Sequence, residues 1–258
     1  MTGVVLAVFC HPDDIEFSAG GTLWLLRQAG CELHYMTVTN GSMGSMTLDA
    51  DRAAEVRRGE SRAAADFLGA HWHASIASDL EVFYAGDLIR RLLAVVRAVS
   101  PDIMLVPAPD DYMEDHVNTS RIAVTAAFCR GMPNYRSIPE VPPVQKDVTL
   151  YHALPHGLRD QLRREVRPDF FVDVSAVLAQ KEQMLALHAS QREWLDATQG
   201  MGSYVASMRN LAAAAGKMSK AFPYAEGWRR HNPIGLSRTE VTPLEEILGQ
   251  RITPEGAR

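Results

Sequence analysis

Cysteines are scarce in this 258-residue sequence: only Cys10, Cys31 and Cys129 occur, too few for a disulfide framework in a chain of this length. No apolar stretch reaches the roughly 18 residues that a membrane-spanning helix needs. The apolar run near the N-terminus is short and lacks the basic residues that begin a secretion signal. Together these absences predict a cytoplasmic protein that has reduced thiols and no membrane span.

The sequence also lacks an excess of positive charge. Its formal net charge is −5, and its lysines and arginines are scattered along the chain. Proteins that bind nucleic acid usually carry a concentrated basic patch. We therefore expect a small-molecule partner and no nucleic acid, whereas the sequence leaves open whether the chain forms a homo-oligomer.

Short apolar runs rich in β-branched residues alternate with amphipathic segments along the chain. This alternation is typical of βαβ units and predicts an α/β fold with a parallel, doubly wound sheet. Because the sequence contains no repeats and no low-complexity linker, residues 1–258 are expected to form a single domain. The predicted strands are Val4–Cys10, Glu32–Thr39, His71–Ile76, Ile103–Pro107, Val148–Leu154 and Phe170–Val174, and the predicted helices are Thr22–Ala29, Asp51–Leu68, Asp87–Val99, Val117–Cys129, Ala176–Ala189 and Tyr204–Ser219.

The first predicted strand ends directly in the segment HPDDIEFSAGGT, where doubly wound sheets place their functional sites. This segment begins with four polar side chains within six residues: His11, Asp13, Asp14 and Glu16. An imidazole and a carboxylate three residues apart on a tight turn can bind one cation, and both ligand types suit zinc. Because adjacent carboxylates repel each other, one is expected to bind the cation while its neighbour accepts a proton from water.

Two alternatives apply to this segment. In one, the two aspartates only cap the following helix, as carboxylates at helix starts often do. In the other, the turn binds a dinucleotide. The second alternative is disfavoured because the glycine pattern G-x-G-x-x-G is missing and the carboxylates would repel a pyrophosphate.

A second polar cluster, APDDYMEDH, follows the predicted strand Ile103–Pro107. A catalytic zinc ion needs three protein ligands and a water molecule, and His116 supplies the third ligand. Asp115 directly precedes it and is placed to orient a ligand from outside the coordination shell. Taken alone, His116 could equally be an ordinary residue at a helix start.

The two clusters resemble the motifs of the LmbE-like (PIG-L) family of metal-dependent N-deacetylases. Further matching segments are Thr39–Ser45, Arg57–Gly69, Phe170–Ser175, Lys181–Gln191 and Tyr224–Trp228, so the resemblance covers most of the chain. It implies a Rossmann-like, doubly wound, mostly parallel sheet with helices on both faces. It also implies one Zn²⁺ per chain, with another divalent ion left open, and removal of the acetyl group from an N-acetylglucosamine-type conjugate.

The resemblance also implies residue roles by matched position. His11, Asp14 and His116 match the metal ligands. Asp13 matches the general base that acts on the metal-bound water. Arg57 and Asp79 match positions that contact the sugar part of the substrate.

Two positions depart from the family pattern. Many members carry His-Pro-Asp-His in the second motif, and the first of these histidines polarises the carbonyl or protonates the leaving amine. Met113 stands at that position and can do neither. Ser42 stands where an acidic residue usually follows Thr-x-Gly. These departures point to an altered substrate or altered acid catalysis.

Candidates for the missing proton donor are Tyr112, His152 and His156, each of which could instead be a polar loop residue. Other functions also remain open: a divergent member that binds metal and sugar without hydrolysis, or a metallohydrolase for another amide. A phosphoesterase is disfavoured because the site carries many carboxylates and few basic residues.

Overall fold

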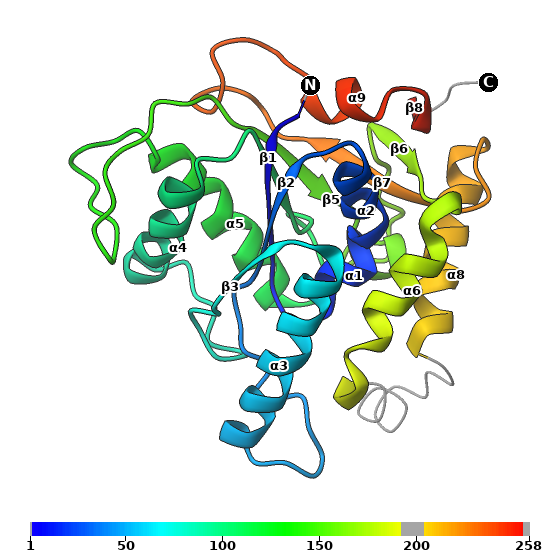
Figure 1. Ribbon diagram of the computed structural model, residues 1–258, viewed down its shortest axis with the longest axis horizontal. Coiled ribbons are helices and arrows are strands. Elements are labelled where there is room, and N and C mark those ends of the chain that lie inside the picture. Colours follow the sequence, from blue (N-terminus) through cyan, green and yellow to red (C-terminus); the bar gives the residue numbers. More distant parts are fainter. Residues whose placement is uncertain (1, 192–203, 255–258) are drawn as a thin grey trace.

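The computed structural model describes residues 2–191 and 204–254, and within them eight strands form one mixed sheet (Figure 1). The strand order across this sheet is β3-β2-β1-β4-β5-β7-β6-β8. The strands are β1 (Val4–Phe9), β2 (Glu32–Thr37), β3 (His71–His73), β4 (Ile103–Val106), β5 (Thr149–Ala153), β6 (Phe170–Asp173), β7 (Ala225–Arg230) and β8 (Ile252–Pro254).

The strands from β3 to β5 in this order are mutually parallel, as the alternation of elements predicts. The rest of the sheet departs from that expectation, because β7 pairs antiparallel with both β5 and β6, and β8 pairs antiparallel with β6. The sequence carries no strand signal for β7, since its residues AEGWRR include glycine and charges instead of a β-branched run. The antiparallel pairing of β7 was therefore not predictable from the sequence.

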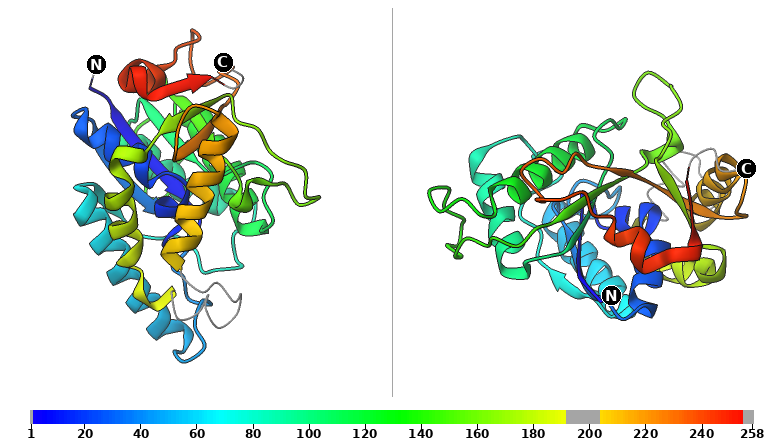
Figure 2. Two further views of the ribbon diagram at one scale, coloured as in Figure 1. Left: turned by 90° about the vertical axis from the view of Figure 1, so that its right-hand side faces the viewer. Right: turned by 90° about the horizontal axis from the view of Figure 1, so that it is seen from above.

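Helices cover both faces of the sheet (Figures 1 and 2). Ala7 of β1 packs with residues of α2, α3 and α6, whereas its neighbour Leu6 packs on the opposite face with residues of α4 and α5. Both residues are fully buried, as expected for a central strand. The helices are α1 (Asp14–Ser18), α2 (Gly20–Gln28), α3 (Ala50–Leu68), α4 (Gly86–Val99), α5 (Glu114–Cys129), α6 (Leu178–Ala186), α8 (Tyr204–Ser219) and α9 (Pro243–Leu248), with short 3₁₀ turns at η1 (His156–Leu158), η2 (Ser175–Val177) and η3 (Gly249–Arg251).

The start of α5 differs from the sequence expectation. The helix begins at Glu114, three residues before the expected Val117. Glu114 and Asp115 lie in its first turn, where negative charge interacts favourably with the helix dipole. His116 therefore lies in the first turn of α5 and not in the loop that precedes the helix.

Two further features concern the cysteines and the helices. Cys10, Cys31 and Cys129 are all free and buried. None of the helices in residues 2–191 and 204–254 combines the length and the apolar character required to traverse a lipid bilayer.

Candidate metal centre and active site

The strand order reverses between β1 and β4, which are neighbours in the sheet. The chain leads from β1 to β2 on one side, and from β4 to β5 on the other side. The turns that follow β1 and β4 therefore open beside each other at the carboxyl edge of the sheet, the usual place for a ligand in doubly wound folds. The fold thus brings the segments His11–Asp14 and Asp110–His116 together.

Three side chains from these turns place their donor atoms in a nearly equilateral triangle. His11 Nδ1 lies 3.2 Å from His116 Nε2 and 3.4 Å from Asp14 Oδ2, and Asp14 Oδ2 lies 3.3 Å from His116 Nε2. Ligand atoms of a tetrahedral zinc site are about 3.3 Å apart when the metal–ligand bonds are about 2.0 Å long. The spacing and the chemistry of these residues therefore fit a zinc-sized divalent ion.

A cavity of about 580 Å³ lies over this triangle. All three residues of the triangle line it, together with polar side chains from several loops and with apolar ones such as Phe17, Met43 and Met113. A volume of this size accommodates a ligand of several hundred daltons. The polar residues of the lining that the sequence analysis had singled out are Asp13, Arg57, Asp79, Tyr112 and His156.

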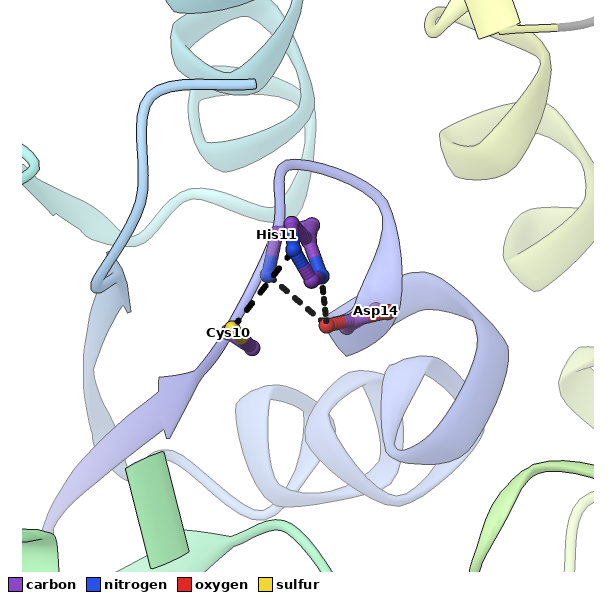
Figure 3. A group of neighbouring side chains, drawn as sticks. All are labelled: Cys10, His11 and Asp14. Carbon is purple, nitrogen blue, oxygen red and sulfur yellow. Dashed lines mark hydrogen bonds and ion pairs between the residues drawn. The ribbon is translucent and has the colours of Figure 1, made fainter. Parts of the chain in front are cut away.

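Cys10 is a further side chain near the triangle that could bind a metal ion, and the sequence analysis did not single it out. Its Sγ lies 3.8 Å from His11 Nε2, and donor atoms of Cys10, His11 and Asp14 fall within 4.8 Å of one another (Figure 3). Cys10 belongs to the buried core that packs against α4 and α5, and it is not among the residues that line the cavity. The ligand set with His116 is favoured because all its members line the cavity.

In both histidines, the ring nitrogen that is not part of the donor triangle (the outer nitrogen) contacts a carboxylate. His116 Nδ1 lies 2.9 Å from Asp111 Oδ1, and His11 Nε2 lies 3.4 Å from Asp115 Oδ2. Such outer carboxylates orient ligating imidazoles and raise their basicity in metal sites. Asp115 was expected to orient a metal ligand, and its carboxylate contacts the ring of His11. Asp111 was missed, although it belongs to the pair of aspartates that follows β4.

The charges of this cluster favour a cation. Burial lowers the pKa of His116, but Asp14 and Asp111 outweigh it and raise that pKa well above its ordinary value. Burial raises the pKa of Asp14, but His116 and His11 outweigh it and hold that pKa well below its ordinary value. Without a metal ion, protons on the imidazoles balance the negative charge of the carboxylates. Binding of a divalent cation should therefore compete with binding of these protons.

Asp13 lies beside the triangle in an unusual backbone conformation. Its φ angle is 114°, a region that residues other than glycine rarely adopt. Its side chain is buried, and its Oδ2 lies 3.3 Å from Arg57 Nη2. Burial raises the pKa of Asp13 above its ordinary value, Arg57 opposes this shift, and the adjacent Asp14 reinforces it. A higher pKa makes this carboxylate a stronger proton acceptor.

Tyr204 also contacts Asp13, and the sequence analysis did not identify Tyr204 as part of the site. The Tyr204 hydroxyl donates a hydrogen bond of 2.5 Å to Asp13 Oδ2. Tyr204 is the first residue of α8 and is nearly fully buried. Its separation from Asp13, 191 residues along the chain, leaves no local signal that could have revealed the contact.

Arg57 and Asp79, the expected substrate residues, both line the cavity. The Arg57 guanidinium donates to the carbonyl oxygen of Pro12 and packs over Gly41, where an added Cβ would lie 2.5 Å from the arginine Cδ. Asp79 accepts hydrogen bonds from the backbone N–H groups of Gly41 and Met43 at 2.8 and 3.0 Å. Both residues therefore also shape the loop at one side of the cavity.

Of the three candidate proton donors, two line the cavity and one does not. Tyr112 and His156 line the cavity, with their ring centroids 5.8 Å apart. Burial lowers the pKa of His156 and raises that of Tyr112 to about 12. His152 does not reach the same rim, because its Nδ1 donates to the Pro107 carbonyl oxygen at 2.9 Å and its Nε2 lies 2.9 Å from His231 Nδ1.

The contact between Asp111 and His116 leads to a prediction. Asp111→Asn should lower the affinity for Zn²⁺ about 10- to 100-fold, because the amide is a poorer acceptor for the imidazole N–H. Competition with a chromophoric chelator measures this affinity. The matched control is Asp110→Asn, since Asp110 is adjacent but exposed and should bind the metal like the wild type. Equal affinities for the two variants would contradict the role of Asp111.

The sheet and the cavity at its switch point define an α/β protein of the Rossmann-like type with a candidate metal centre. The chain belongs to the PIG-L (LmbE-like) family. Residues 6–127 match the family model described as GlcNAc-PI de-N-acetylase, and an uncharacterized deacetylase, YaiS, of Escherichia coli K12 is 30% identical over 50% of this chain and 69% of that protein.

Comparison with known proteins extends this likeness beyond the matched segment. The chain is 28% identical to a diacetylchitobiose deacetylase of Thermococcus kodakarensis, over 87% of this chain and 82% of that protein. It is 27% identical to a 4-oxalmesaconate hydratase of Pseudomonas putida, over 84% of this chain and 89% of that protein. The crystal structure of GalB, the 4-carboxy-2-hydroxymuconate hydratase from Pseudomonas putida KT2440, superposes with a TM-score of 0.74 at 24% identity and covers 94% of this chain and 100% of that one. The predicted fold is thereby confirmed.

Proposed function

We propose that this protein is a metal-dependent N-deacetylase that hydrolyses the acetamide of an N-acetylglucosamine-type conjugate. The observation that carries this proposal is the donor triangle of His11, Asp14 and His116, which lies in a cavity beside the buried Asp13. The relative named as a diacetylchitobiose deacetylase supports the reaction class.

His11, Asp14 and His116 would hold one Zn²⁺ or another divalent ion. When bound, such an ion polarises an amide carbonyl and lowers the pKa of water to about 7. Asp111 and Asp115 keep the two imidazoles oriented toward the centre of the triangle.

Asp13 acts as the general base that takes a proton from the attacking water. Tyr204 and Arg57 both contact its Oδ2 and so orient the carboxylate, which supports Oδ1 as the atom that accepts the proton. The same carboxylate returns the proton to the departing amine, because Met113 offers no proton. His156, Tyr112, Arg57 and Asp79 all line the same cavity. We propose that His156 and Tyr112 donate hydrogen bonds to the acyl oxygen and that Arg57 and Asp79 contact the sugar.

We further propose the extent of the domain and the location of the protein. We assign residues 1–258 to a single LmbE-like domain, because strands that begin at Val4 and end at Pro254 share one sheet. A cytoplasmic location is supported by the three free cysteines, since thiols stay reduced in that compartment.

An assay of amine release tests the deacetylase proposal. The purified protein, supplied with one equivalent of Zn²⁺, should release acetate and free amine in equal amounts from at least one member of a panel of N-acetylglucosamine conjugates. Removal of the metal with a chelator should abolish this release, and added Zn²⁺ should restore it. A metal-loaded protein that releases no amine from any conjugate would contradict the proposal.

Hydration of a double bond is a second candidate, and Met113 is the observation that favours it. The addition of water to a double bond expels no amine, so no donor is needed for a leaving nitrogen. The proton that Asp13 takes from the attacking water is then delivered to the neighbouring carbon. The relative named 4-oxalmesaconate hydratase supports this reaction class. Loss of 4-oxalmesaconate absorbance, together with no amine release, would favour hydration.

A further inference from the structure

A second group of metal-binding side chains lies at the edge of the sheet. β3 is the edge strand, and its parallel register with β2 places His71 opposite His34 and His73 opposite Met36. Side chains two residues apart on a strand share a face, so Glu32 and His34 of β2 project to the same side as His71 and His73 of β3. These four residues form what we call the edge cluster.

The side chains of the edge cluster are in direct contact. Glu32 Oε1 lies 3.0 Å from His34 Nε2 and 3.9 Å from His71 Nε2. The rings of His34 and His71 have centroids 4.9 Å apart. On the other side of the central imidazole, His34 Nδ1 lies 2.9 Å from His73 Nε2. Glu32 Oε1 thus lies between Nε2 of His34 and Nε2 of His71, and His73 contacts the other ring nitrogen of His34.

The edge cluster is separate from the candidate active site. His34 pairs with Leu6 in the first half of β1, whereas the active-site turn begins after the end of β1 at Phe9. The exposed fractions of the His71 and Glu32 side chains are 69% and 55%, so both are accessible from solvent. The His34 side chain is only 11% exposed, which holds the central imidazole in place.

We propose that Glu32, His34 and His71 form a second binding site for a divalent transition-metal ion, with His73 as the residue that orients His34. Two imidazoles and a carboxylate are donors that Zn²⁺, Ni²⁺ and Cu²⁺ accept readily. Because the ligands come from two strands, the bound ion would link the three-residue edge strand β3 to β2 and protect the sheet edge.

Metal stoichiometry in matched variants tests the proposal. Equilibrium dialysis with Zn²⁺ should give two equivalents for the full-length protein without a polyhistidine tag, and one for each of His71→Ala and His116→Ala. The double variant should bind none. The loss in His71→Ala would concern the edge cluster alone, and the loss in His116→Ala the active site alone. The two proposals can therefore fail independently.

Two further variants make the test specific. His231→Ala removes a histidine outside both sites and should bind metal like the wild type. His73→Gln should weaken binding at the edge cluster about 10- to 100-fold, as expected when a ligand loses its orienting partner. With Cu²⁺ added to His116→Ala, the electron paramagnetic resonance spectrum should show two coordinated imidazole nitrogens, and the double variant should give no such spectrum of protein-bound Cu²⁺. Equal Zn²⁺ stoichiometry in His71→Ala and the wild type would overturn the proposal.

Discussion

Asp13→Asn should lower kcat for amide hydrolysis about 10²- to 10⁴-fold, the range that a positioned general base contributes. Asparagine has nearly the same shape and still offers a carbonyl oxygen to Tyr204 and Arg57, whose contacts with Oδ2 hold the native carboxylate. Its amide cannot take a proton from water. The expected defect is therefore in proton transfer, while the architecture of the site is kept.

The metal content separates this defect from a loss of the metal centre. Asp13 lies outside the donor triangle, so Asp13→Asn should retain as many metal equivalents as the wild type by elemental analysis. Asp110→Asn changes an exposed aspartate in the second cluster and should keep nearly full activity. An Asp13→Asn protein with wild-type kcat would remove Asp13 from the mechanism.

His116→Ala is expected to abolish both metal binding at the active site and catalysis. The substitution removes one corner of the donor triangle and leaves His11 and Asp14 as a two-residue ligand set. Catalytic zinc sites use three protein ligands, so the two that remain should bind the ion much more weakly. The variant should contain one metal equivalent less than the wild type.

Thermal unfolding gives an independent measurement of the same loss. A ligand at 100 times its Kd stabilises a folded protein by about 2.7 kcal/mol, which raises Tm measurably. Added Zn²⁺ should therefore raise the Tm of His156→Ala, whose residue lines the cavity outside the triangle, by more than that of His116→Ala. Retention of the full metal complement by His116→Ala would exclude this residue from the ligand set.

The local part of the site was predictable from the sequence. His11, Asp13 and Asp14 are close in sequence on a turn after a buried strand, so their proximity needs only the strand and the turn. His116 follows the strand that becomes β4, and the adjacency of β1 and β4 follows from the usual order of a doubly wound sheet.

Other contacts were not predictable, because they join elements whose pairing the sequence does not encode locally. Asp111 was missed because its partner, the outer nitrogen of His116, depends on where α5 begins. His152 was expected at the cavity because it ends a strand, but its ring is held by Pro107 and His231. Each of these outcomes depends on side-chain direction.

The alternation of buried strands and amphipathic helices, and the polar residues directly after two strands, are properties of the sequence itself. They determined the α/β class and the position of the site, because burial patterns and turn residues act over a few neighbours. Only the tertiary structure decided that Tyr204 donates a hydrogen bond to Asp13 and that β7 pairs antiparallel in the sheet. It also decided that His34 of β2 lies opposite His71 of β3. These contacts depend on the packing of segments far apart in the chain, and such packing is set by the whole core.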